Sequence, residues 1–461
     1  MTLESSTLLS MRLENFKSWK DTGAITLRPL TAFFGVNSSG KSSLLQALLL
    51  LKQTTESRDV RTPLRTKVDK EGYVDLGSIS NLIHHGADHV QIDLGWQLGQ
   101  PISISDGQIK LSALRFSAQI DKSAQVEHLE YDSSGEQSSR LSVSMSRQKD
   151  DSYTLDAQIG NQALTRLPGR PRKGFPPPLK CYGFPDEVQR TYREAELFSD
   201  LSLAFERLFN NILYLGPLRE YPQRIYTWAG EKPSDVGLKG ELAIPVLIAA
   251  GSQPVYVQRG RKVTLARKVE EQLRELGLAK SLNVRSLDIY KRHYEVQIVP
   301  AKGGDDDTNR VLSLSIPDLG FGVSQVLPVL VLCYYAPPGA TVILEQPEIH
   351  LHPSAQAGLA DVFIDVIKKR HLRLIIESHS EHLLRRIQRR IAEGAITPED
   401  TAIYFCDLDE DGTSRLEELQ IDLYGDIQNW PKDFFGDITG DLLEAAKAGL
   451  KRANGKIASS S

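Results

Sequence analysis

A short glycine- and serine-rich segment near the N-terminus limits what this chain can fold into more than any other feature. Gly35-Val36-Asn37-Ser38-Ser39-Gly40-Lys41-Ser42 fits G-x-x-x-x-G-K-[ST], between a strand-like run and a leucine-rich helix over Ser43–Gln53. Glycine permits the tight turn that points backbone N–H groups inward, and the positive end of the helix dipole then favours an anion. We therefore predict a phosphate-binding loop in an α/β protein. A chance glycine-rich turn is the alternative.

A metal-bound triphosphate also requires an acidic side chain at the end of a neighbouring strand. Thr341–Leu344 is a short apolar, β-branched run, and Glu345 follows it directly. We predict that Lys41 reaches the β- and γ-phosphates of ATP, while Ser42 and Glu345 hold Mg²⁺. An ordinary surface acid at a strand end is the alternative for Glu345. The residues predicted to surround the phosphates are Gly35, Asn37, Ser38, Ser39, Gly40, Lys41, Ser42 and Ser43.

Length and composition are those of an ordinary globular protein. The 461 residues, 40% of them hydrophobic, suffice for two or three domain-sized units, and the net charge of −4 argues against a chain that coats nucleic acid. Three scattered cysteines suit a reducing compartment, and the N-terminus lacks a signal-peptide pattern. Apolar runs fall short of the ~20 residues that span a bilayer. We expect a soluble cytoplasmic protein without a membrane segment.

The order of strand-like and helix-like segments divides the chain. Residues 311–405 alternate helix and strand, which predicts parallel strands with crossovers, whereas 54–210 contains alternating segments typical of antiparallel strands. We predict an ATPase head split between 1–53 and 211–400, with an inserted β-rich region over 54–210. Residues 401–461 are expected to form a small α+β tail domain around a hairpin.

Four motifs resemble the ABC-type ATPases of the RecF/SMC/OLD branch. Leu13–Ser18 resembles the opening strand of that branch, Asp318–Gln325 its signature loop, Glu345–Pro353 its Walker B segment and Glu377–Ser380 its switch-histidine strand end. The resemblance implies a P-loop NTPase fold with an ABC-type head, a mixed or parallel sheet and a β-rich N-terminal lobe. It covers about the first 50 residues and about 310–390.

Within that branch, the chain most resembles stand-alone ATPases of bacterial anti-phage systems, such as the Septu ATPase PtuA. Tyr424–Pro431 and Phe434–Asp437 resemble a C-terminal domain of unknown function that occurs on many such proteins. The superfamily resemblance is specific, whereas the choice of defence system is not.

The resemblance also implies a head-to-head homodimer, or a higher homo-oligomer, that sandwiches ATP. Gly322, Ser324 and Gln325 of one subunit would face the P-loop of the other, and His379 would sense the γ-phosphate. Nucleotide would then be part of the interface, so its presence would gate assembly. A simple helix cap is the alternative for Gly320–Gln325.

One position departs from the pattern of the family. Typical ABC heads carry a glutamate directly after the Walker B acid, where it polarises the attacking water, but here the residue is Gln346. An amide cannot accept a proton, so general-base help worth roughly 10²–10⁴-fold is missing. Hydrolysis is then slow, or Glu348 takes over, or a partner completes the site. Our hypothesis is tight ATP binding with weak turnover.

These features together predict an ATP-binding, slowly hydrolysing subunit. We expect it to act as the nucleotide-gated sensor or scaffold of an anti-phage complex, with an effector such as an HNH nuclease encoded in the same operon. DNA contact is a further expectation. The alternatives are a RecF-like DNA repair or recombination ATPase and a non-hydrolysing, ATP-locked scaffold.

Three secondary patterns have competing interpretations. Asp407–Gly412 with Glu418 fits an EF-hand loop, but its flanks favour a hairpin with an Asp-Gly turn. His350, His352, His379 and His382 would suit zinc, but the ABC pattern already explains His379 and the segment around His350 and His352, and the latter two would cap the following helix. One helix face carries Arg385, Arg386, Arg389 and Arg390, which suits DNA phosphates, an acidic partner or plain solvation.

Overall fold

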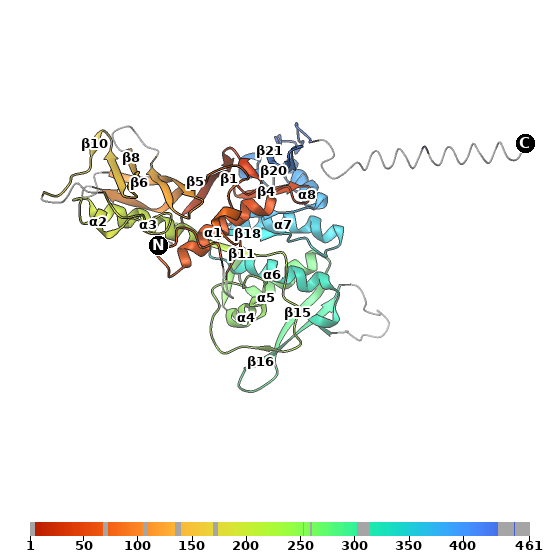
Figure 1. The fold of residues 1–461 in the computed structure, drawn as a ribbon. Helices are drawn as coiled ribbons and strands as arrows, with labels where there is room; N and C mark the ends of the chain where they lie inside the picture. The colour runs from red at the N-terminus through yellow and green to blue at the C-terminus, as the bar shows by residue number, and fades with distance from the viewer. Residues whose placement is uncertain are drawn as a thin grey trace, which may run out of the picture.

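Two large β-sheets organise the chain in this computed structural model (Figure 1). One sheet is six-stranded and mixed, and the other is nine-stranded and antiparallel. These sheets confirm the predicted α/β class and the β-rich N-terminal lobe. The structure describes residues 5–67, 72–104, 109–133, 140–168, 174–251, 253–258, 261–301, 313–431 and 447.

The six-stranded sheet is assembled from strands that lie far apart in the sequence. Its order is β11 (Ile212–Leu215), β18 (Thr341–Glu345), β19 (Arg373–Glu377), β4 (Leu30–Gly35), β20 (Thr401–Leu408) and β21 (Ser414–Glu418). The first five strands run parallel, and only β21 is antiparallel. The carboxyl ends of the parallel strands therefore meet at one edge, where open α/β sheets bind ligands.

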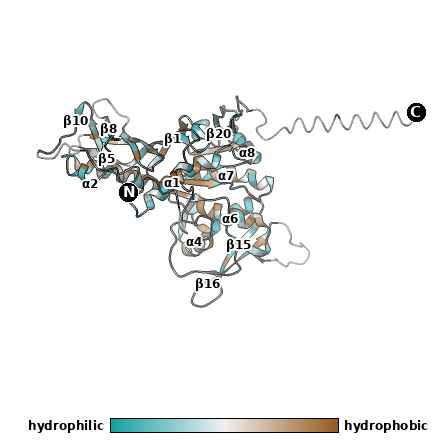
Figure 2. Ribbon diagram, in the orientation of Figure 1, coloured by the Kyte–Doolittle hydropathy of each residue, from teal (hydrophilic) through white to brown (hydrophobic). Residues whose placement is uncertain are grey.

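Helices cover both faces of this sheet, so its central strands are buried and read as continuous apolar runs. The helices are α1 (Lys41–Glu56), α6 (Phe321–Tyr335), α7 (Pro353–Arg370) and α8 (Glu381–Ala392). The leucine-rich helix α1 is deeply buried, because Leu44, Leu45 and Leu48 to Leu51 are each at most 1% exposed. Figure 2 shows hydrophobic stretches in α1 and α6. Pro353 begins α7, and the His352 side chain caps it.

The nine-stranded sheet differs from the predicted insertion. It contains β1 (Thr7–Phe16), β2 (Trp19–Asp21), β3 (Ile25–Thr26), β5 (His89–Ile104), β6 (Ile109–Asp121), β7 (Val126–Asp132), β8 (Leu141–Arg147), β9 (Tyr153–Ile159) and β10 (Gln162–Ala163). β1 lies between β2 and β5 in the sheet order. The predicted border between 53 and 54 therefore separates β1 from β5, although the two strands are hydrogen-bonded to each other. The sequence pattern of a strand does not show which other strand it pairs with.

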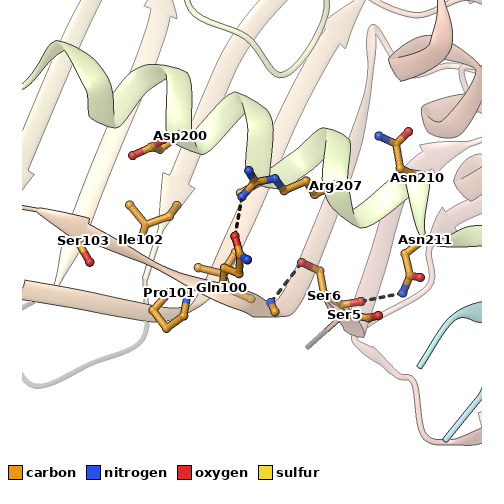
Figure 3. A pocket seen from close by; sticks show the side chains of 13 residues that line it. Ser5, Ser6, Gln100, Pro101, Ile102, Ser103, Asp200, Arg207, Asn210 and Asn211 are labelled. Carbon is orange, nitrogen blue, oxygen red and sulfur yellow. Dashed lines mark hydrogen bonds between the residues drawn. The ribbon is translucent and has the colours of Figure 1, made fainter. Parts of the chain in front are cut away.

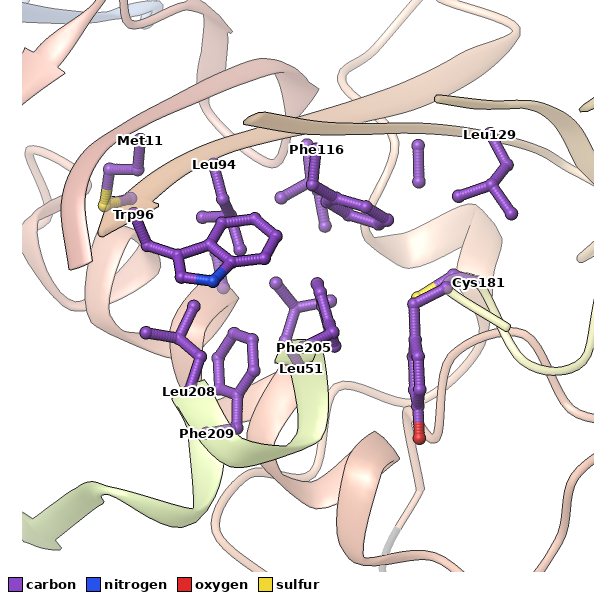
Figure 4. Close-up of a cluster of buried hydrophobic side chains, with 14 of the residues drawn as sticks. Met11, Leu51, Leu94, Trp96, Phe116, Leu129, Cys181, Phe205, Leu208 and Phe209 are labelled. Carbon is purple, nitrogen blue, oxygen red and sulfur yellow. The ribbon is translucent and has the colours of Figure 1, made fainter. Parts of the chain in front are cut away.

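The helix α3 (Ala195–Asn210) closes the apolar side of this sheet, and α2 (Asp186–Gln189) precedes it. Phe205 of α3 packs edge-on against Trp96, with ring centroids 6.2 Å apart, and against Phe116 at 4.7 Å (Figure 4). Lys52 of α1 also donates a hydrogen bond to the Phe209 backbone oxygen at 3.2 Å. These contacts join the β-rich lobe to the helix that follows the glycine-rich loop.

A smaller lobe packs on the other side of α6. It contains α4 (Ala243–Ala250), α5 (Leu265–Glu275) and the strands β12 (Tyr226–Thr227), β15 (Ala279–Ser286), β16 (His293–Pro300) and β17 (Leu314–Ser315), with the hairpin β13 (Pro254–Gln258) and β14 (Arg261–Thr264). Short 3-10 turns occur at Ile79–Asn81, Ile316–Asp318 and Pro398–Asp400. The start of α6 lies beside the loop after β18, because the ring centroids of Phe321 and His350 are 5.9 Å apart.

The C-terminal region also differs from the predicted tail domain. β20 pairs with β4 from Thr401 to Cys406, so the predicted border between 400 and 401 falls inside the central sheet. The predicted hairpin is confirmed, because Leu408 pairs with Ser414 and Gly412 closes the turn onto Asp409, and the EF-hand alternative is wrong. Phe434–Asp437 lie outside the described residues. Among the helices that are described, none has the length and apolar character needed to cross a membrane.

Candidate functional site

The glycine-rich loop connects β4 to α1 and takes a conformation that only some residues allow. Gly35 and Gly40 have φ of 141° and 88°, and Ser38 has φ of 63°. A Cβ atom at Gly35 would lie 2.0 Å from the Cys406 carbonyl oxygen, and one at Gly40 would lie 2.7 Å from Trp19 Nε1. Glycine is therefore required at both positions for space as well as for dihedral angle.

Lys41 is folded onto this loop. Its Nζ donates to the backbone oxygens of Gly35 at 3.1 Å and Val36 at 2.5 Å, and the residue is only 3% exposed. Burial lowers the pKa of Lys41, and the nearby Glu377 carboxyl partly opposes that shift. The ammonium group is thus held at the loop by weak carbonyl dipoles, which a phosphate anion would replace with stronger charge-assisted bonds.

A polar cavity of about 290 Å³ opens over the loop. Residues from four separate parts of the chain line it: Ser18, Asn37, Ser38, Gly40, Lys41, Ser42, Ser43, Gln46, Gln346, Glu377 and His379. The fold therefore brings together most of the predicted phosphate residues with Gln346 and His379. Ser39 lies beneath the loop, where its hydroxyl donates to the Val36 oxygen at 2.9 Å.

Three buried glutamates lie close to this cavity, and each has different partners. Glu345 accepts a hydrogen bond from Tyr214 Oη at 2.9 Å, and burial together with the Glu377 charge raises its pKa to about 7. Glu348 accepts from Ser378 Oγ at 2.7 Å and from the His379 backbone N–H at 2.8 Å, and burial raises its pKa. Neither residue is among those that line the cavity.

Glu377 is the glutamate that lines the cavity. Ser42 Oγ donates to Glu377 Oε1 at 2.9 Å, and Glu377 Oε2 is buried without a hydrogen-bond partner among the described residues. Burial raises the pKa of this carboxyl, while Ser42 and Lys41 favour its charged form. Sequence reasoning placed Glu377 only within the switch-histidine motif and gave it no role.

Gln346 and His379 follow the ends of the strands β18 and β19. Gln346 has φ of 44°, and its backbone N–H donates a hydrogen bond to the backbone oxygen of Glu377 at 2.8 Å. Gln346 lines the cavity, and it occupies the position that the family resemblance predicts for the water-polarising residue. Burial and the Lys41 charge lower the pKa of His379, which favours the neutral imidazole.

The segment Gly320–Gln325 begins α6 and does not line the phosphate cavity. Ser324 Oγ donates to the Phe321 backbone oxygen at 2.8 Å, while the Phe321 side chain is 60% exposed. A Cβ atom at Gly322 would meet its nearest neighbours at 3.6 Å, which is an ordinary contact. Gly322, Ser324 and Gln325 are thus separate from the P-loop of their own chain, as a site shared between subunits requires.

The sequence likewise indicated no role for Arg219, which lies in the segment Gly216–Glu220 after β11. Its Nη2 donates to the Glu345 backbone oxygen at 3.3 Å, and its Nε and Nη1 are buried without partners among the described residues. Burial lowers its pKa to about 10. Arg219 and Tyr214 therefore fix the end of β18 from the side opposite β19. Only the position of this segment after a strand could have suggested such a role.

The alternative sites receive less support from the geometry. No group of three or more His, Cys, Asp or Glu side chains suited to a metal ion occurs within the described part of the chain. On α8, Arg386 and Arg390 each form an ion pair with Asp361 at 2.6 Å, and Arg389 pairs with Glu393 at 2.7 Å. Much of the charge of this helix face is therefore neutralised within the chain.

A larger cavity of about 640 Å³ lies between α3 and β5 (Figure 3). Its lining includes Gln100 and Arg207, whose side chains meet at 3.4 Å. It shares no residue with the phosphate cavity. Cavity size alone therefore does not identify the site that the sequence predicts.

Comparison with known proteins agrees with these observations. The family described as "AAA ATPase domain" matches residues 7–149, and the family described as "AAA domain, putative AbiEii toxin, Type IV TA system" matches residues 259–385. "Protein of unknown function (DUF3696)" matches 396–444, as the resemblance of the C-terminal segment predicted. No curated protein matches the chain.

Solved structures of SMC heads are similar at low identity. The SMC head bound to the C-winged helix domain of ScpA is 13% identical, with 90% of this chain and 98% of that chain covered and a TM-score of 0.45. The SMC head domain from Thermotoga maritima is 11% identical, covering 90% and 100%, with a TM-score of 0.40. A head with an extended coiled coil bound to the C-terminal domain of ScpA, derived from Pyrococcus furiosus, is 12% identical, covering 90% and 96%, with a TM-score of 0.46.

The two ATPase families, the P-loop and the sheet around it define the class of this protein. Together they support a nucleotide-binding P-loop ATPase fold.

Proposed function

We propose that this chain binds ATP with Mg²⁺ in the cavity over the P-loop and hydrolyses it slowly. The observation that carries the proposal is the meeting of Lys41, Ser42 and Gln346 around one polar cavity of about 290 Å³. Lys41 and the loop N–H groups would bind the phosphates, and His379 would contact the γ-phosphate.

The residues at this site fit a magnesium ion. Mg²⁺ prefers oxygen ligands and is usually held by one or two side chains together with the substrate phosphates. The Ser42 hydroxyl and the Glu377 carboxyl, whose Oε2 has no hydrogen-bond partner among the described residues, supply such oxygen ligands. When bound, the ion would neutralise charge on the phosphates.

Slow turnover follows from the arrangement of the candidate bases. Gln346 lines the cavity but cannot accept a proton, whereas Glu348 is engaged by Ser378 and the His379 N–H. Glu348 is therefore poorly placed to replace the absent glutamate. The same observation favours a second candidate function, an ATP-locked scaffold that binds nucleotide without turnover.

We further propose that two chains associate head to head around ATP. Support comes from the position of Gly322 and Ser324 outside the P-loop cavity of their own chain, together with the exposed Phe321 beside them. In such an assembly the nucleotide contributes contacts to both subunits, so ATP would shift the monomer–dimer equilibrium by mass action.

The biological role we propose is that of a sensor or scaffold in an anti-phage complex with a separate effector, such as an HNH nuclease. The family that matches residues 259–385 has a toxin of a type IV toxin–antitoxin system in its description, which supports a conflict system. The ion pairs of Arg386 and Arg390 give little support to DNA contact at α8.

One set of measurements on the purified protein tests the biochemical proposal. Calorimetry should give saturable ATP binding in the presence of Mg²⁺, and single-turnover assays should give slow hydrolysis. Light scattering should show a larger mass with ATP than without it. Absence of binding at millimolar ATP and Mg²⁺ would refute the proposal. Copurification from the intact operon tests the effector.

A further inference from the structure

We propose that Glu377, and not Glu345, is the carboxylate that holds the metal ion beside Ser42. This inference rests on the proposed binding of ATP with Mg²⁺ and assigns one more residue to the same site. The Walker B resemblance implies Glu345 for that role. The two assignments therefore predict opposite rankings of metal affinity when Glu345 and Glu377 are each replaced.

The order of the strands places Glu377 nearer to the P-loop. β19 lies between β4 and β18, and Glu377 is in register with Phe33 on one side and with Glu345 on the other. Neighbouring strands are about 4.8 Å apart, so Glu345 is one strand farther from β4 than Glu377.

The contacts of Glu377 also suit a carboxylate that holds a cation. Ser42 Oγ, the hydroxyl that a P-loop offers to the metal, donates to Glu377 Oε1 at 2.9 Å. Glu377 Oε2 is buried and has no partner among the described residues, although the residue is only 3% exposed. Buried carboxylate oxygens are normally satisfied, and leaving one unsatisfied is costly. A metal ion or its bound water at this position would remove that cost.

The other two glutamates are directed elsewhere. Glu345 is bound by Tyr214 Oη from β11, on the side of β18 that faces away from β19, and Arg219 holds its backbone oxygen. Glu348 accepts hydrogen bonds from Ser378 Oγ and the His379 N–H on Oε1, which fixes the turn after β19. Its Oε2 is also buried without a partner among the described residues, but Glu348 does not line the cavity, whereas Glu377 does. Glu345 and Glu348 thus act as positioning residues, while Glu377 reaches the cavity.

The charge of Glu377 should affect ATP binding in opposite directions with and without the metal ion. Without a divalent ion, the Glu377 carboxylate would repel the phosphates of ATP at short range, since the surroundings are partly desolvated. With the ion present, the same carboxylate would hold it. Replacing Glu377 by glutamine should therefore improve ATP binding without metal and weaken the metal site.

The test compares Glu377→Gln with the matched variant Glu345→Gln. Mn²⁺ binding is measured by electron paramagnetic resonance in the presence of a saturating non-hydrolysable ATP analogue, and ATP binding in EDTA is measured by calorimetry. We expect Glu377→Gln to weaken Mn²⁺ binding by about 10- to 100-fold. Glu345→Gln should weaken it less than Glu377→Gln does, because Glu345 is bound by Tyr214 and does not line the cavity.

The opposite ranking, with a larger loss in Glu345→Gln, would overturn the inference, and so would unchanged Mn²⁺ affinity in Glu377→Gln. If the unsubstituted protein fails to bind ATP at all, the proposed function fails instead, so the two failures are distinguishable. Glu377→Asp provides a second variant that keeps the charge. We expect an intermediate loss of Mn²⁺ affinity, and full retention would count against the inference. Circular dichroism and thermal unfolding without nucleotide check that each variant folds.

Discussion

The P-loop region and the start of α6 differ in how far their side chains are buried and bonded within one chain. At the P-loop, Lys41 is 3% exposed, its ammonium group has backbone partners, and Ser42 is bound to Glu377. At the start of α6, Phe321 is 60% exposed and Tyr221 beside it is 64% exposed, with ring centroids 6.5 Å apart. The first region is preorganised by the fold, whereas the second presents apolar surface that a partner is able to cover.

The largest effect expected from this contrast is on ATP affinity. Lys41→Ala removes two charge-assisted hydrogen bonds to the phosphates, so ATP affinity should fall by about 100-fold or more. Calorimetry with Mg²⁺ measures the change. Lys20→Ala, an exposed lysine on β2, serves as the control and should keep full affinity. Equal affinity in both variants would show that the preorganised region is not the nucleotide site.

The next effect concerns the exposed region alone. Gly322→Trp should leave ATP binding by the monomer unchanged, because Gly322 does not line the cavity over the P-loop. It should weaken ATP-dependent association by at least about tenfold, since the indole would occupy the space of the partner. Sedimentation with and without ATP measures this. Ile289→Trp, at an exposed hairpin position, is the matched control and should still associate. Loss of ATP binding in Gly322→Trp would contradict the view that the start of α6 is separate from the nucleotide site of its own chain.

A moderate gain in the rate of ATP hydrolysis is expected on replacing Gln346, which lines the cavity over the P-loop. Gln346→Glu supplies a proton acceptor in the cavity, so single-turnover hydrolysis should rise by about 10- to 100-fold, short of the full effect of a well-placed base. Brisk hydrolysis by the unsubstituted protein that is lost on changing Gln346, but unaffected in Glu348→Gln, would contradict the hypothesis of weak turnover.

The smallest effect is expected from an ion pair beside the exposed region. Arg224 contacts Asp318 through two hydrogen bonds of 2.6 and 2.8 Å, and both side chains are solvated. Asp318→Asn should therefore shift the midpoint of thermal unfolding by no more than about two degrees. Scanning fluorimetry measures the shift. A much larger decrease would mean that the start of α6 is held as firmly as the P-loop.

The features predicted correctly share a local cause. The Asp-Gly turn within Asp407–Gly412 predicted the β20–β21 hairpin. Gly35 to Ser42 predicted the phosphate loop because its glycines and its lysine act within one turn. Such patterns are readable because the interacting atoms lie within a few residues of one another.

The sequence by itself determined the P-loop, the position of Gln346 after a buried strand and the α/β class, since each depends on short-range spacing. Tertiary structure alone decided that β20 joins β4, that β1 joins the antiparallel sheet, and that Glu377 and not Glu345 lines the cavity. Strand order and register bring together residues hundreds of positions apart, such as Ser42 and Glu377. No local pattern encodes that pairing, because it results from the burial of whole strands and helices against one another.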